Sequence, residues 1–320
     1  MIKKLTTLTI FLLSFNSFTL FSQKHFSKEF SIYNDNDLYT SVKRDRYYTN
    51  GLFLSYRYIS KKANDHLEKK IYEFQIGQEM YTPFKATVNL KGDHDRPFAA
   101  HLFGSFGINR FYKNKSALNT KLQIGIIGPD ALGQELQDFI HSIYNYKKAI
   151  GWNYQIANAI SVNFNTEYLK YLASNKAKTL DITWTNRLRT GTVYTDISTG
   201  LYGRIGFKPL QELFNSIAFS SNLNTANSKT SNKPEAFLFI KPMIHYVLYD
   251  ATIQGSFLNE NSPVTFELRP ITFTTQVGIQ FTANRFNFGY FVNYHSKKLK
   301  SIRVPNANFY GTILINYQFN

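Results

Sequence analysis

The feature that most restricts the fold of this chain is a repeated alternation of apolar and polar residues, broken by polar loops that contain glycine. The segment 311–319, GTILINYQF, is the clearest case. Its odd positions from Ile313 to Phe319 are apolar or aromatic, and its other face carries Thr312 and Asn316. Successive side chains of a strand point to opposite faces. The pattern therefore predicts strands with one face in lipid and the other in a polar interior, and the aromatic at residue 319 suits an outer-membrane barrel.

The same alternation over the rest of the chain predicts an all-β protein, a transmembrane antiparallel β-barrel. The predicted strands are residues 25–35, 48–60, 70–82, 97–112, 119–128, 153–171, 178–190, 192–206, 235–250, 266–284, 286–299 and 308–319. Twelve is an even number, as single-chain bacterial barrels require. The polar stretch from Ser220 to Lys233 is predicted to be an extracellular loop.

The first 22 residues read as a secretory signal. Two lysines give a basic start, an apolar run from Leu8 to Leu20 follows, and Ser22 precedes Gln23 as the expected cleavage point. The run is short for a membrane-spanning helix and contains polar residues. We therefore expect a signal peptide over residues 1–22 and an outer-membrane β-barrel domain over residues 23–320.

Composition narrows the chemistry and the partners. The 320 residues include 22 Tyr and 29 Phe, which a barrel can place in girdles at the two membrane interfaces. The absence of cysteine excludes a thiol nucleophile. A formal charge of +16 is compatible with nucleic-acid binding, but an exported chain is not expected to encounter nucleic acid. An anionic membrane surface is the partner that fits both the positive charge and the expected export. A basic loop surface without a specific ligand is equally compatible with the charge.

One segment departs from the strand pattern. Residues 130–148, DALGQELQDFIHSIYNYKK, have helical spacing, with an apolar stripe that includes Leu136 and Ile140. Gln137 and His141 are four residues apart and share another face of the same helix. Imidazole titrates near neutrality and is the usual general base for activating water. Such a His is otherwise most often a passive surface residue.

Two further clusters carry oxygen ligands or hydroxyls. The run NDND includes Asn34 and Asp35, and alternation from Ile32 turns Asp35 into the barrel interior. Its oxygen atoms could ligate a hard cation such as Ca²⁺, or form an ordinary solvated turn. Thr49 has the parity of Phe53, which predicts an inward position near Asp35, and a Thr before Asn-Gly is otherwise common turn chemistry.

These clusters belong to a longer series of motifs that covers nearly the whole mature chain. The motifs are Asn34-Asp35, Asp45-x-x-Tyr-Thr-x-Gly51, Tyr81-Thr-Pro83, Asp95-Arg96, Gly128-Pro-Asp-Ala-x-Gly-Gln-Glu-x-Gln137-x-x-x-His141, Trp152-x-x-Gln155 and, more weakly, Asp250-Ala-Thr-Ile-Gln-Gly255. Together they resemble the outer-membrane lipid A 3′-O-deacylases, the LpxR-like family. The block that ends at His141 is the most specific of them.

The resemblance implies a twelve-stranded barrel in the outer membrane of a Gram-negative-type bacterium, with the active site near its outer rim. It implies a carboxylic ester hydrolase that removes an acyloxyacyl chain from lipid A with Ca²⁺. His141 would activate water with support from Gln137, Asn34 and Asp35 would help to bind the metal, and Thr49 would position the substrate or stabilise developing charge. The partner would be lipopolysaccharide, and we expect a monomer.

The chain departs from this family at one position. The family has a metal-associated carboxylate six residues after its His, where this sequence has Lys147. A lysine has no acceptor for a metal. Asp37, Asp45 or a backbone carbonyl would have to complete the site. Lys147, Lys85 and Arg96 are instead candidates for binding a lipid phosphate.

Two other functions remain open at this point. The first is a non-catalytic barrel for binding or transport, which keeps the family scaffold with a decayed metal site. The second is a Ser-His phospholipase, but no His-x-Ser tripeptide occurs in the chain. His295 and Ser296 are adjacent, which places them on opposite faces of a strand.

Overall fold

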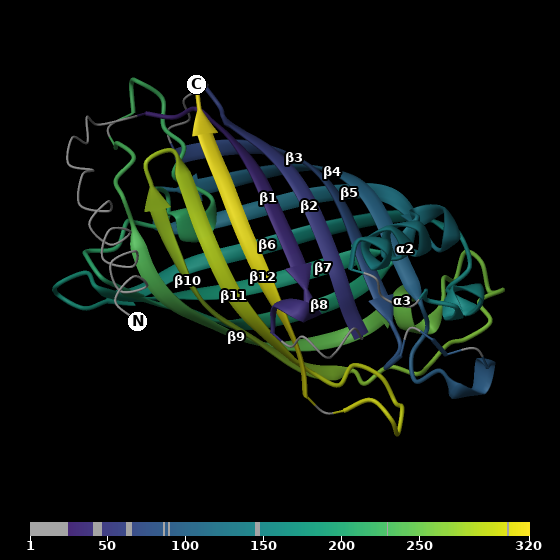
Figure 1. Ribbon diagram of the computed structural model, residues 1–320. Coiled ribbons are helices and arrows are strands. Elements are labelled where there is room, and N and C mark those ends of the chain that lie inside the picture. Colours follow the sequence, from purple (N-terminus) through teal and green to yellow (C-terminus); the bar gives the residue numbers. More distant parts are fainter. Residues whose placement is uncertain are drawn as a thin grey trace, which may run out of the picture.

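Twelve antiparallel strands pair in sequence order and close into one barrel, with β1 next to β12 (Figure 1). The structure is a computed structural model that describes residues 25–40, 47–61, 66–85, 87–88, 90–144, 148–228, 230–305 and 307–320. The predicted signal peptide lies outside the described residues. The strands are β1 (Lys28–Asn36), β2 (Tyr47–Ile59), β3 (Leu67–Thr82), β4 (Ala99–Tyr112), β5 (Ser116–Ile127), β6 (Ala159–Ser174), β7 (Leu180–Gly191), β8 (Tyr194–Gly206), β9 (Ala236–Asp250), β10 (Ile271–Ala283), β11 (Phe286–Ser296) and β12 (Ala307–Phe319).

The predicted fold class and strand count are confirmed. Two predicted strands are too long, because residues 153–158 lie in η5 (Gly151–Tyr154) and the loop after it, and residues 266–270 lie in a loop, rather than in β6 and β10. The apolar side chains of these stretches, such as Ile156 and Leu268, are buried in clusters at the barrel's rim. They therefore do not alternate between lipid and lumen as strand residues do.

The two faces of the strands differ as alternation predicts. On β1, Phe30 and Ile32 are exposed on the outside, while Ser31 and Asp35 are buried inside. Ser31 and Asp35 bond to Asn316 and Thr312 across the β1–β12 seam, which closes the polar interior. No described helix is long and apolar enough to cross a membrane.

Aromatic rings mark two levels on the outside of the barrel. Near the two termini, rings of neighbouring strands lie side by side, as in the pair Tyr58 and Tyr72 with centroids 5.2 Å apart. Near the other end, Tyr294 lies between Phe273 and Phe309, with centroids 6.1 and 5.3 Å away. Aromatic girdles of this kind lie at the two membrane interfaces of outer-membrane barrels.

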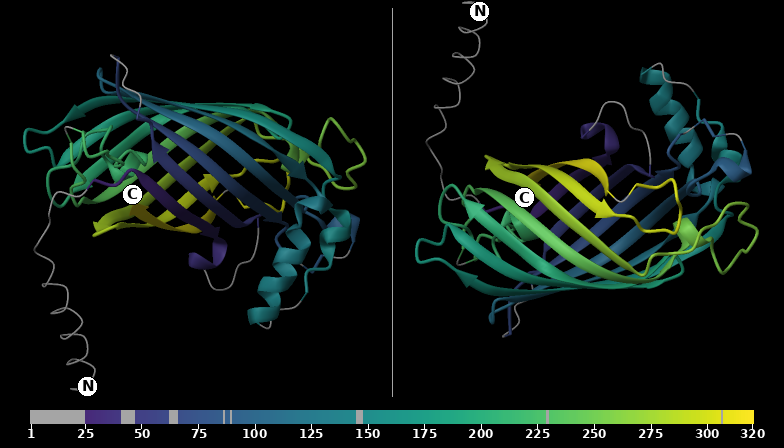
Figure 2. Two further views of the ribbon diagram at one scale, coloured as in Figure 1. Left: turned by 90° about the horizontal axis from the view of Figure 1, so that it is seen from above. Right: turned by 90° about the horizontal axis from the view of Figure 1, so that it is seen from below.

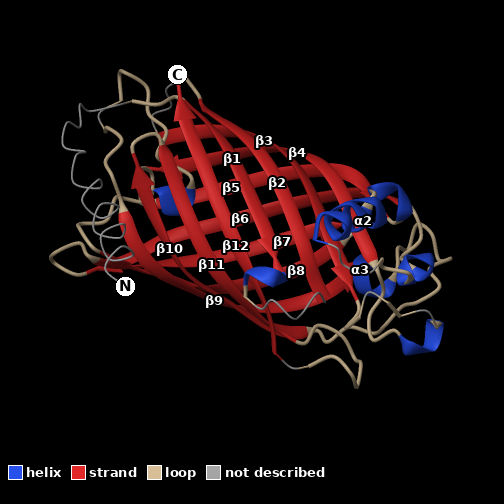
Figure 3. Cartoon of the chain, viewed as in Figure 1, coloured by secondary structure: helices blue, strands red, loops and turns tan. Residues whose placement is uncertain are grey.

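Most helical segments gather at the end of the barrel opposite the termini, which we call the outer end (Figure 3). These segments are η2 (Asp37–Tyr39), η3 (Lys91–Asp93), η4 (Pro129–Ala131), α2 (Gly133–Tyr144), η5 (Gly151–Tyr154) and α3 (Ala251–Gln254). Outer-membrane barrels have short periplasmic turns and longer extracellular loops. The long connections at the outer end therefore identify it as extracellular.

The connection between β8 and β9 fills the opposite end of the barrel. It carries η6 (Ile217–Phe219), and Leu213 and Leu223 pack against inward residues such as Phe111. Lys69 of β3 donates hydrogen bonds to the Ser221 carbonyl at 2.6 Å and to Asn224 at 3.1 Å.

The prediction that Ser220 to Lys233 form an extracellular loop is therefore wrong. The stretch begins after β8, which ends beside the chain termini, and its described residues plug the periplasmic end. Its polar composition matches the polar lumen, because Asn232 donates to Gln318 at 3.0 Å. The residues of this stretch are hydrophilic because they contact the polar interior of the barrel rather than solvent.

Arg204 of β8 holds this plug to the barrel wall. Its guanidinium is buried and pairs with Asp181 at 2.5 Å and with Glu235 at 3.1 Å. It also donates to Ser216 at 2.5 Å and to the Gln211 carbonyl at 3.0 Å. The five charged and polar groups form one buried network, so removing the single cation leaves two buried carboxylates without a counter-charge.

We predict that Arg204→Met destabilises the barrel by about 3–5 kcal/mol, measured by urea unfolding in detergent, because a broken buried pair leaves uncompensated charge. Burial raises the pKa of the Glu235 carboxyl, and Arg204 opposes this shift. Without Arg204 the pKa rises further, so protonation relieves the penalty, and the loss should be smaller at pH 5 than at pH 8. Lys300→Met, which breaks an exposed pair with Glu267, is the control and should have no measurable effect. Equal stability of the two variants would contradict the prediction.

Candidate functional site at the outer rim

Helix α2 lies outside the barrel with its polar face turned toward the wall. Gln137 and His141 are 2% and 6% exposed, whereas Phe139 and Ile143 are 62% and 60% exposed. A helix on a soluble protein buries its apolar stripe. Here Leu136 of the predicted apolar stripe packs against the wall, whereas Phe139 and Ile143 stay on the outer side, where lipid can cover them. Figure 2 shows α2 projecting from the barrel on the same side as η2.

The wall beneath α2 is the outward face of β3, β4 and β5. Met80 of β3 and Ala100 of β4 are buried in one cluster with Trp152 from η5. A side chain at Gly133 would overlap Ala100 and the Trp152 ring, so only glycine lets the start of α2 approach so closely. Gln78 also donates to the Ala131 carbonyl at 2.6 Å, which ties η4 to the outside of β3.

Trp152 fixes the side chain of Gln137. Its indole N–H donates to Gln137 Oε1 at 2.7 Å, and its ring lies 4.9 Å from that of Phe98. The amide orientation of Gln137 is thereby set one helical turn before His141. Both side chains are held over the barrel wall rather than in solvent, and the predicted pairing of the two on one helix face is confirmed.

Thr49 lies on the same outer side, and the prediction that it faces the lumen is wrong. A β-bulge interrupts the pairing of β2 with β3 between Tyr48 and Asn50, which leaves Thr49 as the extra residue. Tyr48 takes the inward position, where its hydroxyl donates to Asp35 at 2.8 Å. Thr49 instead bonds to Thr82, 2.7 Å away, on the face opposite Tyr81. A bulge changes the parity of a strand, and nothing in the sequence pattern marks its position.

Asn34 and Asp35 project from opposite faces of β1. Asn34 donates to the Gly51 carbonyl at 3.0 Å and accepts from Tyr39 at 2.5 Å on the outside. Asp35 faces the lumen, as predicted, and accepts from Thr312 at 2.5 Å and from Tyr48. The structure therefore brings Asn34 to the outer side with Thr49, and it separates Asp35 from both.

The described residues do not assemble a side-chain site for Ca²⁺. Ca²⁺ takes six to eight oxygen ligands around one point. The side chains of Asn34 and Asp35 point away from each other, and among the described residues no group of three His, Asp, Glu or Cys side chains could hold a metal. Asp45 and Lys147 lie outside the described residues. We therefore derive no step of a reaction through a metal ion.

The candidate phosphate-binding residues differ in their surroundings. Lys85 is exposed beside the Phe84 ring. Arg96 is buried, stacks on the Tyr81 ring and donates to Thr252 of α3 at 3.2 and 3.1 Å. Burial lowers the pKa of Arg96, and nearby Asp250 opposes that shift. Arg96 thus joins two outer loops.

The structure also contains a Ser-His-Glu arrangement that the sequence did not reveal. His101 lies 2.7 Å from Ser161 Oγ and 3.4 Å from Glu79 Oε2, on three different strands. The side chains of Ser161 and His101 are both 0% exposed, so an ester substrate cannot reach them. We assign the arrangement to the packing of the lumen. His295 Nδ1 lies 3.3 Å from the Ser296 carbonyl, while the Ser296 hydroxyl accepts from the Phe273 N–H, so this pair does not form a Ser-His dyad.

Several residues of this site could not be identified from the sequence. Thr82, Gln78, Trp152 and Tyr39 carry no feature in the sequence that marks their contacts. Their roles depend on contacts between segments that are far apart in the chain, such as Trp152 with Gln137 and Thr82 with Thr49. These residues could have been identified only from a signal that two distant motifs lie in contact.

Comparison with known proteins agrees with this geometry. The family model described as "Outer membrane protein LpxR" matches residues 6–319. The chain belongs to the LpxR family. It is therefore an outer-membrane protein, and the predicted location is confirmed. The comparison with curated protein sequences found no match.

A solved structure of this family has the same fold. LpxR from Salmonella typhimurium superposes with a TM-score of 0.70 at 21% identity, over 91% of this chain and 100% of that chain. The β-domain of the Bordetella autotransporter BrkA gives 0.46 at 8% identity, over 92% of this chain and 99% of its own. The translocator domain of NalP from Neisseria meningitidis gives 0.41 at 10% identity, over 99% and 96%.

The contact between Trp152 and Gln137 gives a direct test of the helix position. We predict that Trp152→Phe, which keeps the ring against Phe98, costs about 1–2 kcal/mol, because the buried Gln137 oxygen loses its donor. Gln137→Leu in the same background should recover part of this loss, since it removes the oxygen that has lost its donor. Urea unfolding of the two single variants and the double variant measures the coupling. Strictly additive effects would show that the two side chains do not interact.

Proposed function

We propose that this protein is an outer-membrane lipid A deacylase that hydrolyses an ester-linked acyl chain of lipid A, with His141 activating water. The observation that carries the proposal is the orientation of α2 on the outside of the barrel wall. It holds an imidazole and an amide against the barrel wall, on the side that faces the outer leaflet. A soluble substrate would not require the exposed Phe139 and Ile143, whereas a lipid substrate would surround them.

The chain's own residues supply general-base chemistry in this proposal. Neutral His141 accepts a proton from water, and the resulting hydroxide attacks the ester carbonyl. The proton then passes from the imidazolium to the leaving alkoxide, so no covalent enzyme intermediate forms. Gln137, fixed by Trp152, orients the ring or the water, and the Thr49 hydroxyl can donate to the developing oxyanion. Asn34 lies on the same outer side, where its amide oxygen accepts a hydrogen bond from Tyr39.

The substrate's charge matches that of the protein. The formal charge is about +14 without the two lysines near the N-terminus, and lipid A is an anionic phosphorylated lipid. Lys85 is exposed at the outer end and is proposed to contact a phosphate, and Lys147 keeps the same proposed role. We propose that the protein acts as a monomer, since a closed barrel leaves no sheet edge to pair with a second copy.

The alternative is a barrel that binds or transports without catalysis. The plug between β8 and β9 argues against transport, because it fills the periplasmic end with packed side chains. A conducting pore would require that segment to leave. A decayed enzyme would keep the scaffold but lose hydrolysis, which the following experiment detects.

We predict that purified protein in vesicles releases a fatty acid from lipid A, and that His141→Ala lowers the rate at least 100-fold by removing the general base. Mass spectrometry of lipid A would measure the loss of one acyl chain. His66→Ala, in a periplasmic turn, is the matched control and should keep the full rate. Intact lipid A after incubation with the folded native protein would refute the enzymatic function.

Ca²⁺ enters the proposal through the family resemblance alone. If it assists, EGTA should lower the hydrolysis rate and added Ca²⁺ should restore it. A rate that is unaffected by EGTA would remove Ca²⁺ from the proposal.

A further inference from the structure

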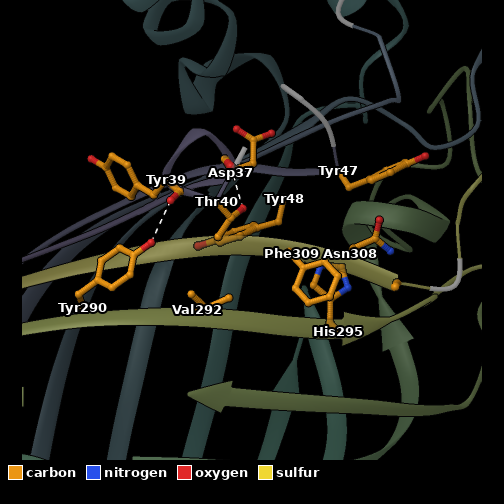
Figure 4. Close-up of a pocket in the computed structure, with 11 residues that line it drawn as sticks. Asp37, Tyr39, Thr40, Tyr47, Tyr48, Tyr290, Val292, His295, Asn308 and Phe309 are labelled. Atoms are coloured by element: carbon orange, nitrogen blue, oxygen red, sulfur yellow. Dashed lines mark hydrogen bonds between the residues drawn. The ribbon is translucent and has the colours of Figure 1, made fainter. Parts of the chain in front are cut away.

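A cavity lies at the outer rim, on the other side of β1 from α2. It has a volume of about 380 Å³ and lies between η2 and the ends of β11 and β12. Figure 4 shows Tyr39 and Thr40 above it, and Tyr290 and Val292 below. The size falls within the range of small-molecule sites in proteins.

Segment η2 forms the roof of this pocket and is fixed at two points. The Tyr290 hydroxyl donates to the Tyr39 carbonyl at 2.9 Å, and the Tyr39 hydroxyl donates to Asn34 at 2.5 Å. A side chain at Gly311 would overlap Tyr39, so glycine lets η2 lie directly on β12. The roof of the pocket therefore touches Asn34, one of the outward residues of the candidate site.

The pocket lies at the depth where a lipid headgroup meets its acyl chains. Phe309 lines it and belongs to the outer aromatic level with Tyr294 and Phe273. Such girdles mark the membrane interface. Val292 and Tyr290 have the outward parity of β11, so this side of the pocket faces lipid rather than the lumen.

The lining combines side chains from the two faces of the barrel wall. Tyr290, Val292 and Phe309 have the outward parity of their strands, whereas Tyr48, His295 and Asn308 have the inward parity. Asn308 is 6% exposed, and within the described part of the chain its Oδ1 has no hydrogen-bond partner. A buried acceptor without a donor costs free energy unless a ligand supplies one. The occupant should therefore have an apolar part and an O–H or N–H donor at its polar end.

We propose that this pocket binds one acyl chain of the lipid substrate, with the chain against Tyr290, Val292 and Phe309 and a headgroup donor at Asn308 Oδ1. The inference rests on the proposed function, since it adds a subsite to the same lipid-facing rim. Tyr39 then acts as a positioning residue, because it forms the pocket's roof and bonds to Asn34. Occupancy of the pocket fixes the lipid relative to the α2 side of the wall.

Binding is tested apart from hydrolysis with the His141→Ala protein in phosphatidylethanolamine vesicles. The probe is lipid A with one diazirine-labelled acyl chain, and peptide mapping locates the photo-crosslinks. We expect labels concentrated on β11 and β12 near Val292 and Phe309. Val292→Trp, which fills the pocket, should reduce this labelling at least tenfold. Ile205→Trp is the matched control, since Ile205 is an exposed outward residue of β8, and it should leave the labelling unchanged.

Asn308→Leu keeps the side-chain size and removes the acceptor together with the long 3.3 Å bond to the Pro305 carbonyl, so labelling should fall about fivefold, as expected for one lost hydrogen bond to the ligand. Equal labelling around the barrel, or labelling unchanged in Val292→Trp, would overturn the subsite. Heat-modifiable migration on gels verifies that each variant is folded.

The same variants in the native His141 background separate the two proposals. If the subsite is correct, Val292→Trp raises KM for lipid A about tenfold with little change in kcat. Labelling at β11 and β12 without any hydrolysis by the native protein would overturn the proposed function and keep the subsite. Normal hydrolysis with KM unchanged in Val292→Trp would overturn the subsite and keep the function.

Discussion

The structure depends on one constraint: in a lipid environment every backbone N–H and C=O must find a partner within the protein. Twelve strands satisfy it by pairing in order and closing β1 on β12. Closure forces side chains to alternate between lipid and lumen, which gives the wall an apolar outside and a polar inside. Charged groups enclosed in this way need partners of their own. Arg57 therefore bonds to Glu29 at 2.7 Å and to Glu73 at 2.5 Å, and Arg204 ties the plug to the wall.

The periodicity of two made most of this fold predictable from the sequence. It located all twelve strands and the inward position of Asp35, and the different periodicity of residues 130–148 located α2. It did not predict Thr49 correctly, because a bulge inverts the alternation and leaves no mark in composition. It also misplaced Ser220 to Lys233, since a polar segment inside a polar lumen looks the same in sequence as a polar segment in water.

The candidate site shows where pattern analysis reaches its limit. Gln137 and His141 were found because helical spacing puts them on one face. Which face the protein buries could not be read from that spacing, since the usual rule buries the apolar one. Trp152 and Thr82 acquire their roles only through contacts across the fold. The family resemblance named Asn34 and Asp35 together as metal-binding residues, whereas the pleat of β1 points their side chains to opposite faces.

The apolar side chains that α2 leaves exposed have a thermodynamic consequence. Phe139, Ile143 and the half-exposed Leu132 lose contact with water only when acyl chains cover them, and that transfer contributes about 25 cal/mol for each Å². Part of the free energy that holds the helix in place therefore belongs to the bilayer and not to the chain. The barrel can close on its own hydrogen bonds, but the helix that carries His141 is fully stabilised only after insertion. A detergent that covers the barrel wall but leaves this helix exposed to water would preserve the fold and destabilise the position of α2.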